Sequence, residues 1–599
     1  MPECLASGLK LGAMRVGIDF GTTHTVAAVV DRGNYPVVSF DGVAGWPSLI
    51  AANAAGEIRF GLDAAAVRRE PGWSVLRSFK RLLNDAGPHT EVNLAGRDYP
   101  LAELLTGYLA RFEDDLRHRS NAGLEPGEPI EAAISVPANA SSAQRFMTLD
   151  AFLAAGFHVV AMLNEPSAAS LEYAHRYRST ITAKREYVLI YDLGGGTFDA
   201  SLLKMTGQVN EVVVSEGIQR LGGDDFDQAI LQLVVSGAKL PGVAQASDPL
   251  REECAARKET IGPQTRRFLV DLTVLDGIDR PPFACGIDEV YSACAPLVEQ
   301  TIDVLSRVLH DPVATGSGAA WSEVAGIYLV GGAGGFPLIS RMLRTAFGEK
   351  RVKRSPHPFA ATAIGLAVFL DTKANFQLSE HFSRHFGVFR EAQAGADVVF
   401  DPIVPKDASL PADGHSPLVV RRTYRAAHNI GHFRFVECSR LVDGRPDGDV
   451  TPYDPVYFPF DPALYHRHDL GRQPVGRCND GPDVEERYVV APGGAVEVTL
   501  TAQPTGFRRT FRLERRARHG CDHGALRRHA NDVRGARVHR RPAARRGAVT
   551  HLRHRPVRPQ RRQPAGRPHH RGTRRRRPSS PGRAGHPGRP PLPRPAAGG

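Results

Sequence analysis

The chain contains few cysteines, few tryptophans and no long apolar run. Its seven cysteines are scattered among 599 residues, and no two of them form a Cys-x-x-Cys pair. This spacing argues against a disulfide framework and a cysteine-based zinc site, and it is typical of a reducing compartment. No apolar segment is long enough to span a membrane, and no basic-then-apolar segment has the pattern of a secretory signal. We therefore expect a cytoplasmic protein without a membrane partner.

The C-terminal tail, residues 515–599, lacks Ile, Met, Phe, Tyr, Trp, Lys and Glu altogether. It holds 25 Arg against two Asp, a formal charge of +23, so the other 514 residues carry −11 of the overall +12. A segment of this composition cannot bury enough apolar surface to offset chain entropy, which predicts disorder. Clustered Arg can neutralise nucleic-acid phosphates. We favour the interpretation that GC-rich DNA is translated here out of frame or past a lost stop codon. Nucleic acid is an expected partner only if the tail is genuine.

Two glycine-rich turns are the most informative feature of the acidic body. The first is VGIDFGTT at 16–23, and the second is LIYDLGGGTFD at 189–199. In each motif an apolar run is followed by Asp, then by Gly and Thr, and then by a second apolar run. This order is typical of a β-hairpin with a tight turn. Because glycine has no Cβ, backbone N–H groups in such a turn can approach phosphate closely, and a nearby carboxylate can organise Mg²⁺ through water. The two turns together predict a nucleotide held between two similar halves.

Further motifs follow in order after and between these turns. They are AISVPA at 133–138, LNEPSAAS at 163–170, LGGDDFD at 221–227 and IYLVGGAGGFP at 327–337. With the two turns, this set resembles the nucleotide-binding domain of the 70-kDa heat-shock chaperones, within the actin and sugar-kinase superfamily. The resemblance covers about residues 14–372 and continues more faintly to about 514. It implies an α/β fold, a two-lobed actin-like ATPase domain of duplicated ribonuclease-H-like folds.

The expected domain organisation follows from this resemblance and from changes in composition. Short alternating strands among Pro- and Gly-rich turns after residue 386 predict a β-sandwich, similar in position to the family's peptide-binding domain. The family's apolar linker is not recognisable at residues 371–376, and the tail stands where its helical lid would begin. The expected segments are an N-terminal extension (1–13), the nucleotide-binding ATPase domain (14–372), a linker (373–385), the β-sandwich (386–514) and the disordered tail (515–599).

The resemblance also implies roles for individual residues. Asp19 and Asp192 would hold Mg²⁺ through water, while Glu165 and Asp199 would order the attacking water and the metal. Lys80, in SFKRLL, matches the family's catalytic lysine and would stabilise developing charge. The expected catalytic set is Lys80, Glu165, Asp199, Asp19 and Thr197. The expected ATP- or ADP-binding set is Gly21, Thr22, Thr23, Gly194, Gly195, Gly196, Thr197, Gly222, Gly223, Lys258, Gly331, Gly332 and Ala333.

The adenosine side of the expected site departs from the family. Lys258 is kept, but Ala255, Glu259 and Gly262 stand where the family has an acidic, a basic and a serine contact. The family's Ser-Thr-Arg after the Gly-Gly pair is replaced by residues 333–335, Ala-Gly-Gly, so the arginine that would stack on adenine is missing. Phe359 replaces an Asp and could either stack on the base or pack in the core. We expect Mg²⁺-triphosphate binding to be retained and adenine to be held weakly or by a rearranged pocket.

The expected function is that of an ATP-binding and ATP-hydrolysing chaperone-like protein, Mg²⁺-dependent and slow. It would couple nucleotide state to the binding of unfolded polypeptide, with a co-chaperone and a nucleotide-exchange factor as further partners. One alternative is a small-molecule kinase of the same superfamily, which would need a substrate-binding insertion and a base near the γ-phosphate. Another is a non-catalytic nucleotide sensor, filament or scaffold protein, against which Lys80 together with Asp199 weighs.

Overall fold

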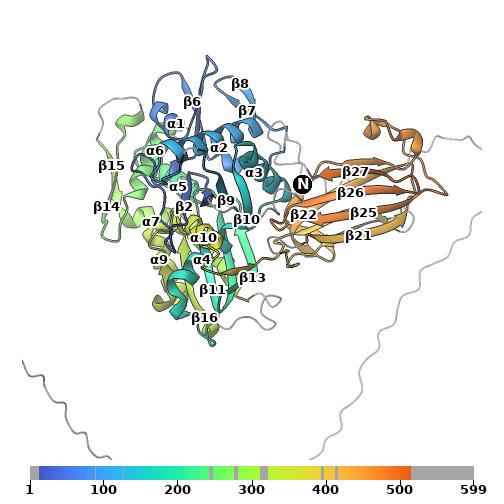
Figure 1. The fold of residues 1–599 in the computed structure, drawn as a ribbon. Helices are drawn as coiled ribbons and strands as arrows, with labels where there is room; N and C mark the ends of the chain where they lie inside the picture. Colours follow the sequence, from blue (N-terminus) through green and yellow to red (C-terminus); the bar gives the residue numbers. More distant parts are fainter. Residues whose placement is uncertain are drawn as a thin grey trace, which may run out of the picture. The chain divides into compact units, whose positions relative to one another are not determined.

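The computed structural model describes residues 13–513, except 88, 126, 242–246, 276–280, 311–320, 393–396 and 412–415 (Figure 1). The described residues all belong to one compact unit of the chain, residues 1–520. The expected tail and all but one residue of the expected N-terminal extension lie outside the described residues. No helix in the described part is long and apolar enough to cross a membrane.

The first glycine-rich turn joins two strands of a five-stranded sheet. Strands β1 and β2 are antiparallel, with Asp19 opposite Val26, and β9 and β10 run parallel to β1 on its other side. Val16, Ile18 and Phe20 are all fully or almost fully buried, which explains the apolar alternation before the turn. The sheet order is β10-β9-β1-β2-β3, with β1 at Met14–Phe20, β2 at His24–Val29, β3 at Trp46–Pro47, β9 at Ile130–Val136 and β10 at His158–Asn164.

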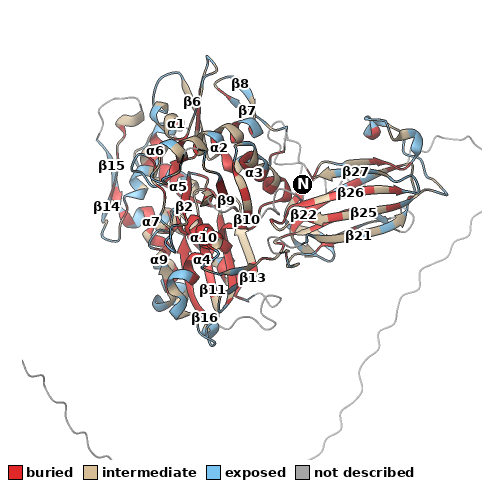
Figure 2. Cartoon of the chain, in the orientation of Figure 1, coloured by how far each residue is buried: buried red, intermediate tan, exposed pale blue. Residues whose placement is uncertain are grey.

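The second turn stands in the same position in a six-stranded sheet. Strands β11 and β12 are antiparallel, with Asp192 opposite Asp199, and β16 runs parallel to β11. Strands β11 and β16 are buried along nearly their whole length (Figure 2), as expected of strands covered on both faces. The order is β17-β16-β11-β12-β13-β18, with β11 at Tyr187–Leu193, β12 at Phe198–Thr206, β13 at Val209–Ile218, β16 at Val324–Val330, β17 at Val352–Arg354 and β18 at Gln377–Ser379.

The edge strand β18 comes from the segment expected to be a linker. Its residues 377–379 pair in parallel with residues 209–211 of β13. The sequence signal was weak because the strand is short and has one apolar residue, Leu378. Leu378 packs against two buried clusters, and backbone pairing with β13 adds to this contact.

The helices follow the apolar periodicity of the sequence. The periodic segments at 99–119, 143–155 and 288–309 form α2 (Leu101–His118), α3 (Ser142–Ala154) and α7 (Ile287–His310). Ser141 caps α3, because its side chain accepts a hydrogen bond from the backbone N–H of Gln144. The other α-helices used below are α4 (Glu165–Tyr177), α5 (Gly223–Gly237), α6 (Asp248–Glu259), α9 (Pro337–Phe347) and α10 (Ala361–Leu370).

Short elements complete this part of the chain. A small helix, α1 (Gly61–Val67), accompanies β4 (Leu49–Asn53), β5 (Ile58–Phe60) and β6 (Trp73–Arg77), which form a three-stranded sheet. Two hairpins pair β7 (Glu91–Leu94) with β8 (Arg97–Pro100), and β14 (Arg267–Val270) with β15 (Phe283–Gly286). Two short 3₁₀ helices matter for the site, η1 (Phe79–Asn84) and η6 (Ala333–Gly335).

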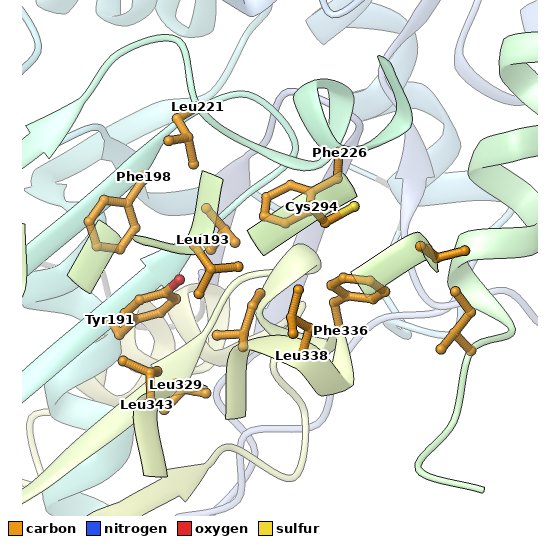
Figure 3. Packing of buried hydrophobic residues seen from close by; sticks show 14 of the residues in the cluster. Tyr191, Leu193, Phe198, Leu221, Phe226, Cys294, Leu329, Phe336, Leu338 and Leu343 are labelled. Carbon is orange, nitrogen blue, oxygen red and sulfur yellow. The ribbon is translucent and has the colours of Figure 1, made fainter. Parts of the chain in front are cut away.

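A buried cluster includes the residues on either side of the second turn (Figure 3). Leu193 and Phe198 flank the turn on β11 and β12, and both are fully buried. Phe226 of α5 meets Phe336 with a ring-centroid distance of 5.8 Å, which connects α5 to the start of α9. Because the flanking strands and helices share this packed core, the turn is held on a rigid base.

The C-terminal strands form two antiparallel sheets that share one buried cluster. The first has the order β20-β19-β22-β23, with β24 paired to β22, and the second has the order β21-β25-β26-β27. Phe386, Phe435 and Tyr488 are fully buried between them. The bounds are β19 His385–Ala392, β20 Asp397–Val404, β21 Leu418–Arg425, β22 Ile430–Val442, β23 Arg445–Pro452, β24 Val456–Pro459, β25 Asp483–Val490, β26 Val496–Gln503 and β27 Phe507–Arg512.

Candidate functional site

The two glycine-rich turns lie against each other. A Cβ built on Gly195 would come within 2.4 Å of Cγ2 of Thr23, and one built on Gly196 within 2.7 Å of Oγ1 of Thr22. Both distances are shorter than real Cβ contacts, so only glycine permits this approach. Residues more than 170 positions apart in the sequence therefore form one loop-against-loop surface.

The start of α5 sets the orientation of the second turn. The N–H groups of Gly223 and Asp224 donate to the carbonyl oxygens of Gly194 and Gly195, each at 2.9 Å. A Cβ on Gly222 would lie 2.5 Å from the backbone nitrogen of Gly196, so α5 and the turn approach at the backbone level. The carbonyls of Gly194 and Gly195 thus face the helix.

The backbone N–H groups of the expected phosphate-binding residues fall into two classes. Those of Gly194 and Gly331 are already bonded, to Thr197 O at 3.1 Å and to Pro358 O at 2.8 Å. Within the described chain, those of Thr22, Thr23, Gly195 and Gly196 donate no hydrogen bond. Since unpaired N–H groups in a tight turn are the donors that cradle phosphate, the second class is the available one.

Arg81 also holds the second turn, and the sequence reasoning missed it. Its guanidinium Nη2 donates to Gly196 O at 2.8 Å and to Asp225 Oδ2 at 2.6 Å. The only signal in the sequence was its position directly after Lys80, where a second cation is easily taken for solvated surface.

Lys80 and Glu165 form a buried ion pair beside the turns. Lys80 Nζ lies 2.6 Å from Glu165 Oε1, and the two residues are only 6% and 8% exposed. Phe79 anchors η1 in the core, with its ring 4.9 Å from that of Tyr108. Ser78, just before η1, has φ of 51°, and its hydroxyl donates to Asp224 at 2.6 Å, which fixes the turn that aims Lys80.

Asp19 has a partner that sequence reasoning overlooked. The hydroxyl of Ser135, on β9, donates to Asp19 Oδ1 at 2.9 Å. A serine in β9, a buried strand whose only other polar residue is Glu131, was the available signal, since a buried hydroxyl is expected to have a partner. This bond holds the Asp19 carboxylate at the mouth of the first turn.

Burial and neighbouring negative charge raise the pKa of three carboxylates of the site. Burial first and the charge of Glu165 second raise the pKa of Asp19 to about 6 and that of Asp199 to about 8. The pKa of Asp192 is also raised, by burial and then by Glu165, Asp19 and Asp199. Burial opposes the charge on Lys80, but Glu165, Asp19 and Asp192 outweigh it and raise its pKa. Four acidic groups thus surround one cation.

This arrangement fits a cation and a polyphosphate. The surplus of negative charge is what a divalent cation would neutralise, and the glycine-lined surface has N–H groups without partners. Among the described residues, no three His, Cys, Asp or Glu side chains are grouped closely enough to hold a metal ion directly. A small space of about 10 Å³ beside Thr197 and Asp199 has room for one water.

The adenosine side of the expected site is more open than the side formed by the two turns. Lys258 Nζ binds Asp227 Oδ1 at 2.6 Å and Gly223 O at 3.0 Å, so it is held beside the start of α5. Cβ positions built on Gly262 and Gly332 meet nothing within 4 Å. Phe359 is 40% exposed, which excludes the alternative that it packs in the core.

Comparison with known proteins agrees with this geometry. Residues 82–377 match the family model described as Hsp70 protein. The chain is 28% identical over 464 residues to the chaperone protein DnaK of Thermosipho africanus, covering 73% of this chain and 75% of that protein. It is 28% identical over 479 residues to DnaK of Thermotoga maritima, with the same coverage. The chain belongs to the 70-kDa heat-shock protein family.

A relative from rice matches over a shorter range. The heat shock 70 kDa protein BIP3 of Oryza sativa subsp. japonica is 31% identical over 389 residues, which is 59% of this chain and 56% of that protein. Membership of the 70-kDa heat-shock family confirms the resemblance drawn from the ordered motifs, and it does not favour the small-molecule kinase alternative.

Proposed function

We propose that this 70-kDa heat-shock protein is an ATP-dependent chaperone whose hydrolysis site lies between the two glycine-rich turns. In this proposal the two sheets are duplicated ribonuclease-H-like lobes, and the C-terminal sheets form a β-sandwich that binds unfolded polypeptide. ATP is the substrate, and Mg²⁺, held through water by Asp19 and Asp192, would neutralise charge on its phosphates.

The chain's own residues would perform the rest of the chemistry. The free N–H groups of Thr22, Thr23, Gly195 and Gly196 would hold the β- and γ-phosphates. Lys80 would offset the charge that develops on the transferred phosphoryl group, and its ion pair with Glu165 keeps the ammonium in place.

A proton acceptor is also present in the proposed site. Asp199 lies on β12 directly after the second turn, and its raised pKa of about 8 makes the carboxylate a stronger base than a solvent-exposed Asp. With Glu165 it would orient the attacking water and take up its proton.

The observation that carries this proposal is the contact between Thr22, Thr23 and Gly195, Gly196 in front of the buried Lys80–Glu165 pair. A single glycine-rich turn is common in proteins. Two such turns in contact, with a buried lysine beside them, are not needed to stabilise the fold. Burying such a pair away from solvent is rarely favourable for stability, so it is better explained by catalysis.

The C-terminal sheets contact helix α3, and we propose that this contact senses peptide binding. Glu437 of β22 accepts a hydrogen bond from the Ser142 hydroxyl of α3 at 2.7 Å, and Arg145 of the same helix donates to Gly493 O at 2.8 Å. Helix α3 also contacts η1, the segment that carries Lys80. We propose that α3 relays the state of the β-strands to the catalytic lysine.

Steady-state phosphate release from the full-length protein tests the proposal. Release should require Mg²⁺, be stimulated by unfolded peptides and be indifferent to sugars, since water is the acceptor. Binding of ATP without any Mg²⁺-dependent release would instead support the nucleotide-sensor alternative and refute the enzymatic part of the proposal.

A further inference from the structure

The turn that lacks the family's arginine has another arginine beside it. A Cβ built on Gly335 would lie 2.7 Å from Nη2 of Arg354, the last residue of β17. The guanidinium of Arg354 therefore occupies the space that a side chain at position 335 would enter. Since β17 pairs in parallel with β16, which leads directly into the Gly331-Gly332 turn, Arg354 belongs to the same sheet edge as this turn.

Arg354 is exposed, and its guanidinium has no hydrogen bond or ion pair with any other described residue. The neighbouring cation on the strand, Lys353, does have a partner, because its Nζ lies over the Tyr177 ring at 4.9 Å from the ring centroid. Alternate residues of a strand point to opposite faces, so the two cations diverge. An unpaired, planar guanidinium beside an open glycine turn is available to a ligand.

The surrounding space suits a flat ring. Cβ positions on Gly332 and Gly334 meet nothing within 4 Å, whereas Ala333 is 3.6 Å from the Cβ position of Gly223 and so borders the phosphate side. Phe359 is exposed on the segment whose Pro358 carbonyl accepts from the Gly331 N–H, so an aromatic face is tied to the same turn.

We propose that Arg354, supplied from β17, contacts the nucleobase in place of the arginine missing from the glycine turn, with Phe359 as a further wall. This inference rests on the proposed function, because it assigns the base end of the nucleotide whose phosphates lie at the two turns. A guanidinium that stacks on a purine ring favours nucleotides over a polyphosphate without a base. It discriminates little between adenine and guanine, because it does not contact the edge of the ring. We expect a preference for ATP and ADP over inorganic tripolyphosphate, with weak discrimination against GTP.

Titration calorimetry on the full chain distinguishes the affinity due to the base from the affinity due to the phosphates. The probes are ATP, GTP and inorganic tripolyphosphate, each with Mg²⁺. Arg354→Ala should weaken ATP binding roughly tenfold, the range of a desolvated cation–π contact, and change tripolyphosphate binding much less. The matched control is Arg344→Ala, which removes an exposed arginine of α9 and should change neither.

A rescue variant distinguishes stacking from a general loss of structure. Gly335 does not have a positive φ, and its only close neighbour is the Arg354 side chain, so Gly335→Arg in the Arg354→Ala background should be accommodated. It should restore ATP affinity to within about threefold of the starting protein, as expected if one guanidinium can replace the other.

The outcomes are distinct. An unchanged ratio of ATP to tripolyphosphate affinity in Arg354→Ala would overturn the assignment of Arg354 while leaving the proposed function intact. Equal loss of both ligands without rescue would also overturn it, because the effect would then be structural. If the unaltered protein bound neither ligand with Mg²⁺, the proposed function would fail, and this inference with it.

Discussion

The ammonium of Lys80 lies 2.6 Å from the carboxylate of Glu165, and both groups are buried although one comes from η1 and the other from the first residue of α4. Glu165 is also the residue whose charge contributes to the raised pKa of Asp19, Asp192 and Asp199. This pair therefore joins the lysine beside the two turns to the acidic groups of the site.

Removing the lysine tests whether the pair is catalytic. Lys80→Ala should lower phosphate release at least 100-fold, because a positioned cation can contribute several kcal/mol to the transition state. ATP affinity measured by calorimetry should change less than about fivefold, since the backbone N–H groups of the turns remain. Lys204→Ala is the control, because this lysine of β12 is partly exposed and paired with Glu186, and it should leave phosphate release and ATP affinity unchanged. Normal turnover in Lys80→Ala would reject its role.

The crowding of carboxylates predicts a pH-dependent effect of Asp199→Asn. The folded pKa of Asp199, about 8, is above its unfolded value near 3.8, so its favourable contribution is present below pH 3.8 and lost as pH rises to 8. The ligand-free variant should therefore be more stable than the starting protein by about 1–3 kcal/mol at pH 8.5 and much less so at pH 5.

Thermal unfolding at the two pH values measures this difference, and phosphate release from the same variant should be lost. Comparing the variant with the starting protein at each pH removes the trend due to Asp19. Without the charge of Asp199 the pKa of Asp192 should also fall, which stabilises the variant in the same direction. A variant equally stable or less stable at pH 8.5 would contradict the raised pKa.

The backbone approach between α5 and the second turn predicts that Gly222→Ala weakens nucleotide binding. The added Cβ would lie 2.5 Å from Gly196 N and 2.6 Å from Gly195 O, and backbone atoms cannot move aside cheaply. We expect at least a tenfold loss of ATP affinity and a lower unfolding temperature. Gly194→Ala is the matched control, since its nearest neighbour is 3.7 Å away, an ordinary contact. Equal effects of the two substitutions would show that steric crowding is not the cause.

The contact between α3 and β22 predicts a separation of basal and stimulated activity. Glu437→Ala removes the acceptor of the Ser142 hydroxyl and should abolish peptide stimulation while changing basal phosphate release less than twofold. Asp447→Ala, on the neighbouring strand β23, breaks an exposed ion pair with Arg440 and should leave stimulation intact. Full stimulation of Glu437→Ala by peptide would show that the signal does not pass through this contact.

The turns and their carboxylates could be predicted because their chemistry is local. Gly195 and Gly196 precede Thr197 in a pattern typical of a turn whose backbone lies close to phosphate. The apolar residues of β1 and β11 can likewise be recognised in the sequence. The partners could not be predicted in the same way. Ser135 and Arg81 are ordinary residue types whose roles depend on strands and helices far away in the sequence, and the same holds for Arg354 beside Gly335.

Strand β18 has a mechanical consequence for the protein. It is the last pairing before the chain enters the C-terminal sheets, and it is joined to β13, which pairs with β12, where Gly217 lies opposite Asp199. Three residues of parallel pairing at a sheet edge are readily peeled away compared with a central strand. A pull on residues 380–385 would act on the hydrogen bonds of Glu380 with Asn164 and of His381 with Val212, and then on this short strand, two strands from the carboxylate that would receive the water's proton.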